Sequence, residues 1–423
     1  MNLSKKLKSN TFRDFFSLLF SSLFQKFLGL IREIVIAFLF GSSLFYANFL
    51  VLQSIAGLFS QFTIGNSLKS NLLPKFTKIF EMHKEISLKK VLSFSMKSMI
   101  FLFVLSQLIQ FLIIWYLDSD YSKYLLVISI FLSITICINF HNTIYLTILQ
   151  SQGRFIKFSL ATTLNEFIVV LFVYPLSLIL GVFGLVISRV IGVMSITVSY
   201  IIPMNRRKEG YELELSAKDF NVPTLILGNF ANILILSSRF ISGTDGSNSI
   251  TYFTYSVFIL NALLTAVIGN ISTLLLRNVS IKKNSAFMFY SLLVSILLGF
   301  ILVIGLHYFA VDLIKLIFMR GQFNLEDVMN TAKFIKNLSY AFVLIFISTT
   351  LFQPFFSLSI DSSRKERRNY SIIFISTIIL GLVFSLFTNY SVEIESLIVI
   401  YSGSVVGLIL SVISYSYYLK KNK

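Results

Sequence analysis

Residues 124–149 read YLLVISIFLSITICINFHNTIYLTIL, a run that contains no Asp, Glu, Lys or Arg. A helix needs about 20 mostly apolar residues to cross roughly 30 Å of membrane hydrocarbon, so this run is long enough to span a bilayer. Inside lipid the peptide groups have no water to bond with, and a helix satisfies them within the segment itself. The run therefore predicts a transmembrane helix.

Similar runs recur along the whole chain. Reading for stretches of this length and composition predicts twelve spans, at about 15–40, 44–65, 92–117, 124–149, 157–179, 182–203, 220–242, 250–275, 286–311, 335–360, 370–389 and 396–419. The first run is too long and too charged for a cleavable signal peptide. The expected fold class is thus an all-α integral membrane protein with about twelve transmembrane helices.

The composition agrees with this class. The 423 residues are 56% hydrophobic and 13% charged, whereas a soluble domain carries about 25% charged residues. The only cysteine, Cys137, lies inside an apolar run, and the three histidines are scattered. No disulfide framework, metal site or cofactor is expected.

The basic residues test the map of spans independently. With the N-terminus placed in the cytoplasm, 27 of the 36 Lys and Arg residues fall on the cytoplasmic side, 5 fall outside and 4 lie within spans. This asymmetry follows the positive-inside rule and predicts cytoplasmic N- and C-termini. The same distribution explains the net charge of +17 without a nucleic-acid partner. The basic cluster 364–368 is expected to anchor the topology and secondarily to attract anionic lipid.

A polar stretch divides the chain near its middle. It covers about 204–219 and separates six predicted spans from six. The division predicts two six-helix bundles, residues 1–210 and 211–423, as in transporters built from related halves. A second polar segment, 312–336, is expected to lie along the outer surface.

The first span carries a motif. Lys26-Phe-Leu-Gly29-Leu-Ile-Arg32-Glu33, running into Ile36-Ala-Phe-Leu-Phe-Gly41, resembles the first helix of the MurJ (MviN) family, which reads Arg-x-Leu-Gly-x-x-Arg-Asp followed by Ala-x-x-Phe-Gly. Weaker matches follow along nearly the whole chain, at Leu73-Pro74, Gln152-Gly-Arg154-Phe155 and Ile317-Phe-Met-Arg320-Gly321-Gln322-Phe323.

The resemblance implies a function and a fold. Family members flip lipid II, an undecaprenyl-pyrophosphate-linked cell-wall precursor, and belong to a wider superfamily of polysaccharide and drug exporters. It thus implies a MATE-like, exporter-superfamily architecture in the bacterial cytoplasmic (inner) membrane. Many members carry two further C-terminal helices that are not expected here.

The sequence also departs from the family. An Asp after the first helix falls at Ala47 or Asn48, an Arg pair of the second helix near Ser60 and Gln61, and an Arg of the eighth helix near Ser256. Those arginines are thought to hold the substrate's pyrophosphate, so an altered substrate site is expected.

Charged residues inside spans are the candidate substrate-binding groups. Each costs about 3 kcal/mol near the membrane centre on insertion scales and usually faces a cavity or a partner. Lys26 and Glu33 are seven residues apart and share a helix face, with Arg32 beside them. We expect this face to border a hydrated cavity; the alternative is a local ion pair that steadies one helix.

Three more charges complete the set. Glu166 is expected to be a proton- or sodium-sensitive gate, or alternatively to pair with Arg189 on the next span. Arg239 is a candidate substrate ligand that alternatively extends to the outer interface. If all six residues shared one cavity, the net charge of +2 would favour an anionic head group.

Glycines within spans allow two interpretations. Hinges for alternating access are one, and close helix packing is the other. The residues concerned are Gly29, Gly57, Gly65, Gly299, Gly381 and Gly407.

The expected function is a lipid-linked oligosaccharide flippase that works by alternating access. No catalytic residues are expected, and no phosphate-binding loop is present, so an ion gradient or the membrane potential is the expected drive. Two alternatives remain: an exporter of small lipophilic or cationic compounds, and a non-transporting scaffold for envelope synthesis.

Overall fold

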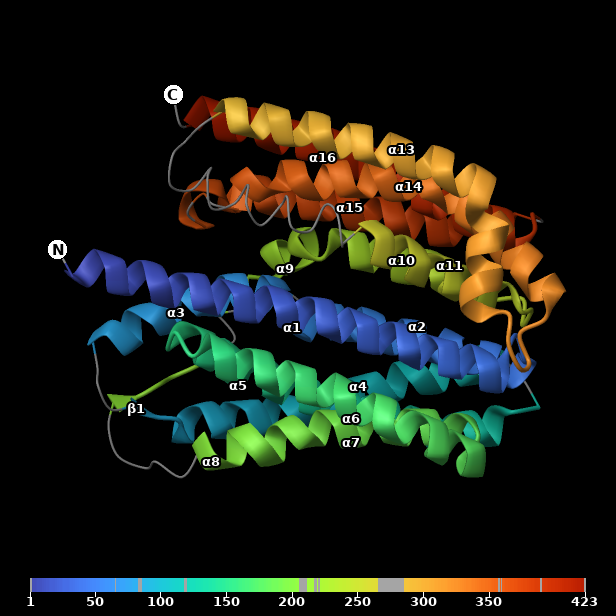
Figure 1. Ribbon diagram of the computed structural model, residues 1–423, viewed down its shortest axis with the longest axis horizontal. Coiled ribbons are helices and arrows are strands. Elements are labelled where there is room, and N and C mark those ends of the chain that lie inside the picture. Colours follow the sequence, from blue (N-terminus) through green and yellow to red (C-terminus); the bar gives the residue numbers. More distant parts are fainter. Residues whose placement is uncertain are drawn as a thin grey trace. The chain divides into compact units, whose positions relative to one another are not determined.

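The computed structural model describes residues 2–64, 66–82, 86–117, 120–204, 211–216, 219, 221–264, 285–356, 358, 360–388 and 390–421. Almost all of them are helical (Figure 1). The helices of the N-terminal part are α1 (Asn2–Phe40), α2 (Leu44–Ile64), α3 (Asn66–Met82), α4 (Lys89–Leu117), α5 (Ser122–Ser151), α6 (Phe155–Leu180), α7 (Val182–Ile196) and α8 (Ile202–Met204). The remaining helices are α9 (Val222–Gly228), α10 (Phe230–Ile241), α11 (Ser249–Leu264), α13 (Ser285–Phe318), α14 (Leu325–Phe356), α15 (Ile360–Phe387) and α16 (Val392–Lys421).

The chain packs into two compact units. The first unit contains residues 1–39 and 59–225, and the second contains residues 40–58 and 226–423. The first part of α2 therefore packs with the C-terminal helices. The division into bundles at 1–210 and 211–423 stays a prediction.

Nine described helices are long and apolar enough to cross a membrane, or ten if the bent pair α9 and α10, which meet at 72°, counts as one span. The protein is thus a multi-pass membrane protein. Neither α1 nor α11 is among the ten. The apolar stretch of α1 carries three charges, and α11 is short, with residues 265–275 of its predicted span outside the described part of the chain.

Two boundaries between spans illustrate what the sequence could decide. The predicted break near Gly181 is correct: α6 ends at Leu180, and Gly181 has a left-handed φ of +58°. The expectation that 312–336 lies along the outer surface stays a prediction, but most of this segment is helical. Helix α13 continues to Phe318 and α14 begins at Leu325, because the apolar residues among these charges bury a helical face; Val328 and Ile335 are fully buried.

Buried polar side chains join α4 and α5 in the first unit. The hydroxyls of Ser106 and Ser133 lie 2.9 Å apart, and Gln110 donates hydrogen bonds to both of them. Gln107 donates to Ser133 at 2.7 Å. Within a membrane such bonds stabilise a helix pair by about 1 kcal/mol each. They account for polar residues in spans that are otherwise apolar.

Residues 211–216 pack against the first unit, to which they belong. Strand β2 (Tyr211–Glu212) pairs in parallel with β1 (Ile86–Ser87). Leu213 and Leu215 follow β2 and are buried in a core cluster that includes Phe76. We call the described residues of this segment, 211–216 and 219, the docked linker.

Close helix packing dominates the second unit, where α14 contacts α11, α13 and α16 (Figure 1). A Cβ at Gly403 would overlap Leu234, and one at Gly407 would lie 2.9 Å from the Phe230 ring. These glycines let α10 and α16 approach closely. Position 403 faces 234 and position 407 faces 230, so the two helices run antiparallel.

The basic cluster 364–368 is only partly a surface feature. Arg364 and Arg368 are exposed, but Arg367 is 2% exposed. Its guanidinium donates to the carbonyl oxygens of Leu358 (3.0 Å) and Phe355 (3.3 Å), where α14 ends. The expectation that this cluster anchors the topology stays a prediction; Arg367 within it satisfies carbonyl groups at a helix C-terminus.

Candidate substrate site

Polar contacts fix α1 on α6 in the first unit. Ser21 Oγ lies 2.7 Å from Thr163 Oγ1 and donates to the carbonyl of Ser159 at 3.2 Å. Gln25 Nε2 donates to Thr162 Oγ1 at 3.0 Å. Higher residue numbers on α1 meet higher numbers on α6, so the helices run parallel, as expected for the first and fifth of the predicted spans.

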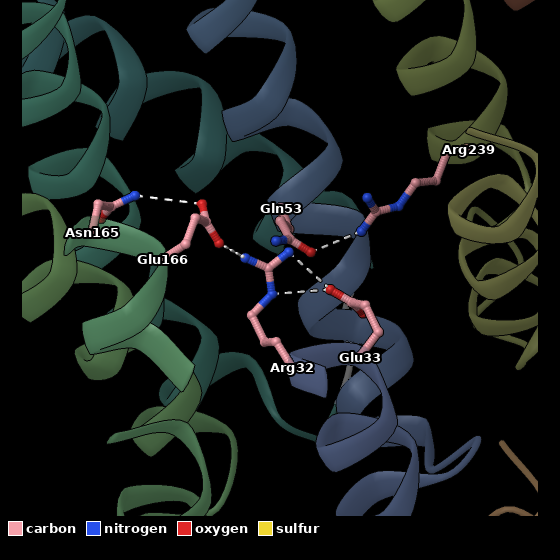
Figure 2. Close-up of polar contacts among 6 residues, drawn as sticks. All are labelled: Arg32, Glu33, Gln53, Asn165, Glu166 and Arg239. Atoms are coloured by element: carbon pink, nitrogen blue, oxygen red, sulfur yellow. Dashed lines mark hydrogen bonds and ion pairs between the residues drawn. The ribbon is translucent and has the colours of Figure 1, made fainter. Parts of the chain in front are cut away.

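Arg32 lies between two carboxylates (Figure 2). Its Nη2 and Nε donate to Glu33 Oε1 at 3.0 and 3.1 Å, and its Nη1 donates to Glu166 Oε2 at 2.9 Å. The side chains of Arg32, Glu33 and Glu166 are 21%, 9% and 26% exposed. We call these three residues the Arg32 cluster.

The Arg32 cluster contains more acid than base. One guanidinium faces two carboxylates, which gives a formal charge of −1 when all three groups are ionised. Charges that are partly removed from water are stable when paired and hydrogen-bonded. The expectation that this face borders a hydrated cavity stays a prediction, while the local ion pair of the alternative is present between Arg32 and Glu33. Glu166 takes Arg32 as its partner.

Asn165 supports Glu166 from the same helix. Its Nδ2 donates to Glu166 Oε1, the oxygen that Arg32 does not use, at 3.4 Å (Figure 2). Its own Oδ1 would lie 2.8 Å from a Cβ at Gly192 on α7. The absence of a side chain at Gly192 therefore makes room for Asn165. Arg189 lies on α7 as well and is partly buried.

Lys26 and Gly29 lie on the same helix, α1, but Gly29 is buried. Lys26 is exposed, and a Cβ at Gly29 would have no atom within 4 Å. In contrast, Gly57 and Gly299 each face a neighbouring side chain at 3.1 and 3.0 Å. Gly381 and Gly407 do the same, and Gly65 lies outside the described residues. Close packing thus explains four of the six glycines but not Gly29.

Arg239 belongs to the second unit and is partly buried. Its Nη2 donates to Gln53 Oε1 on α2 at 2.9 Å and to the Leu50 carbonyl at 3.4 Å (Figure 2). Both alternatives for Arg239, substrate ligand and extension to the outer interface, stay predictions.

Two positions where family charges are missing are packed with neutral groups. Ala47 and Asn48 are 2% and 6% exposed. Ser256 is fully buried, and its hydroxyl bonds to the Tyr252 and Thr331 carbonyls. The Ser256 hydroxyl thus joins α11 to α14.

Several functional candidates were missed at the sequence level. Gln25, Thr162, Thr163 and Asn165 contact or flank the Arg32 cluster, and Gln53 holds Arg239. In the sequence these residues are recognisable only as polar residues within a predicted span. Serines and threonines occur in many spans, so this feature does not single them out. Among the residues that the structure describes, no group of three or more His, Cys, Asp and Glu side chains is arranged to hold a metal ion.

No protein-family model matches the chain, and no curated protein sequence matches it. Solved structures do. The lipid II flippase MurJ in an inward closed conformation matches with a TM-score of 0.74 at 18% identity, over 95% of this chain and 87% of that chain.

Transporters of a second kind match less closely. An inward-facing multidrug resistance MATE family transporter of the MOP superfamily has a TM-score of 0.63 at 13% identity, over 94% of this chain and 96% of that chain. MATE in the straight conformation has a TM-score of 0.59 at 13% identity, over 98% and 96%. The protein thus has the all-α membrane fold that MurJ and MATE transporters share, and the predicted fold class is confirmed.

Proposed function

We propose that this protein is a flippase that moves an undecaprenyl-pyrophosphate-linked sugar, lipid II or a related lipid-linked oligosaccharide, across the bacterial cytoplasmic membrane. It works by alternating access, without catalysing a reaction, and both its termini face the cytoplasm. The observation that carries the proposal is the fold: the TM-score to the MurJ flippase is 0.74, and those to two MATE transporters are 0.63 and 0.59. The motif on α1 supports it.

Each candidate residue has a role in this proposal. Lys26, Arg32, Arg189 and Arg239 attract the pyrophosphate, because cations favour a multiply charged phosphate. Glu33 orients Arg32 through two hydrogen bonds. Glu166 is the gating and ion-coupling group, and H⁺, Na⁺ or the membrane potential drives the cycle. Membrane lipids solvate the substrate's polyprenyl tail.

Complementation tests this function. A bacterium depleted of its own lipid II flippase receives the wild-type gene or Arg32→Ala, and surface-exposed lipid II is quantified with growth. We expect exposure and growth with the wild type and neither with Arg32→Ala, although both proteins insert equally. Failure of the inserted wild type would reject lipid II as the substrate, and normal export by Arg32→Ala would reject the role of Arg32.

One observation favours a second function. The Arg32 cluster has a formal charge of −1, which suits a cation better than an anion. An exporter of small cationic or lipophilic compounds would use the excess carboxylate to attract its cargo. Efflux of a lipophilic cationic dye by cells that express the chain, without exposure of lipid II, would support this alternative.

A further inference from the structure

The two carboxylates around Arg32 are held differently. Glu33 adjoins Arg32 in sequence, accepts two of its hydrogen bonds on one oxygen and is 9% exposed. Glu166 comes from α6, accepts one hydrogen bond from Arg32 and is 26% exposed. Its other oxygen has only a long contact of 3.4 Å with Asn165. Glu166 is therefore the carboxylate that another anion can replace more easily.

The packing of α1 against α6 does not depend on this ion pair. Ser21 and Gln25 on α1 bond to Thr162 and Thr163 on α6, about three and two helical turns before Arg32. These contacts are between neutral groups. These neutral hydrogen bonds keep α1 and α6 in contact when the ion pair between Glu166 and Arg32 is broken.

From this geometry we infer that Glu166 is a built-in competitor of the substrate: it occupies Arg32 until a phosphate-bearing head group displaces it. The inference rests on the proposed function and assigns a specificity role to the site. Exchange of one anion for another keeps the guanidinium paired throughout, which avoids an isolated charge in a poorly hydrated place.

The competition selects for a chemical class. A single carboxylate offers Arg32 nothing that Glu166 does not already supply. A phosphate or pyrophosphate carries more charge and more acceptor oxygens, and it forms strong charge-assisted bonds with guanidinium groups. The site should thus prefer phosphate-bearing head groups to carboxylate-bearing ones.

Binding measurements test the inference. The full chain is placed in lipid nanodiscs, and the Kd for undecaprenyl pyrophosphate is measured for wild type, Glu166→Gln, Glu166→Asp and Arg32→Ala. Gln removes the competing charge, and Asp is one methylene shorter and reaches Arg32 less well. We expect both Glu166 variants to bind about tenfold tighter, and Arg32→Ala to lose binding. Undecaprenol, which lacks phosphate, should bind all proteins equally.

A matched control removes a buried carboxylate elsewhere. Glu395 in the second unit is 4% exposed and accepts a hydrogen bond from Thr388 at 2.9 Å. Glu395→Gln should leave the Kd unchanged. Glu395→Gln removes one carboxylate charge, as Glu166→Gln does. It therefore controls for a nonspecific loosening of the fold.

The outcomes separate the two proposals. If Arg32→Ala loses binding but neither Glu166 variant gains affinity, the head-group site stands and the competition is rejected. If wild type and Arg32→Ala bind equally, the proposed head-group site is wrong, and so is the competition for it. Binding by the Glu166 variants alone would support the competition, and binding by none of the four proteins would reject both ideas.

Discussion

Lys75 on α3 and Asp219 in the docked linker form an ion pair, with Nζ and Oδ2 2.7 Å apart. Lys75 also donates to the Glu214 carbonyl at 3.0 Å, so one side chain bonds to the linker twice. Burial alone would raise the pKa of Asp219 above 3.8, but hydrogen bonds from Lys75 and Ser216 outweigh it and lower the pKa. The hydrogen bond from Lys90 lowers the pKa of Glu214 below 4.5.

These shifts predict an acid-sensitive linker. A carboxyl group whose pKa is lowered in the docked state stabilises that state at pH values above its ordinary pKa and ceases to do so as the pH falls through the lowered value. Docking should thus be constant at neutral pH and weaken as the pH falls below about 4. The Leu213 amide donates a hydrogen bond to the Ser87 carbonyl at 3.1 Å. Its hydrogen-exchange protection factor, corrected for the intrinsic exchange rate at each pH, measures how firmly the linker is docked.

Asp219→Asn provides the comparison for this pH series. It should lower protection of the Leu213 amide already at pH 7, because Lys75 loses its charged partner. Asp245→Asn, in the loop after α10, should have no effect. A pH-independent protection factor in the wild type would contradict the role of the carboxylates.

Substitution by alanine should affect the stability of the protein at one glycine and not at another. A Cβ at Gly184 would overlap the Leu176 carbonyl at the turn between α6 and α7, whereas one at Gly29 meets nothing within 4 Å. Gly184→Ala should destabilise the protein by about 1–3 kcal/mol through overpacking. Gly29→Ala should leave the melting temperature in detergent unchanged. Equal melting temperatures for both variants would be inconsistent with the described turn.

Arg367 and Arg368 are adjacent but differ in environment. Arg367 is 2% exposed and bonds to two carbonyls at the end of α14, while Arg368 is exposed. Arg367→Ala should cost about 1–3 kcal/mol because buried carbonyls lose their donor. Arg368→Ala should cost little. Thermal unfolding in detergent checks both, and a larger effect at Arg368 would reverse the assignment.

Topology can be tested at the two ends of α5. Lys123 and Arg154 flank this helix, and the positive-inside rule assigns Lys123 to the outside and Arg154 to the cytoplasm. In a Cys137→Ala background, a membrane-impermeant maleimide should label Lys123→Cys in intact cells and Arg154→Cys only after lysis. The reverse labelling pattern would overturn the predicted orientation.

The fold was largely predictable because its signal is local. Predicted spans such as 124–149 coincide with a single helix, because their apolar length is visible in the sequence itself, whereas 220–242 covers α9 and α10, which are bent by 72°. The candidate site was predictable in composition but not in pairing. Glu166 could pair with Arg189 on α7 or with Arg32 on α1. The distances between these side chains cannot be read from the sequence. Arg367 was missed for the same reason: its partners are carbonyl groups, which every residue has.

The membership of residues 40–58 in the second unit affects how the protein is made. On the ribosome these residues emerge early, yet Gly57 packs against Leu236 and Gly41 lies against Gln322. Residues 40–58 therefore lack these final neighbours until α10 and the turn before α14 have been translated. Until then an insertase or lipid acyl chains have to shield the side of α2 that later packs against α10. A nascent chain arrested at residue 225 would present α2 without its packing partners to the cell's membrane proteases.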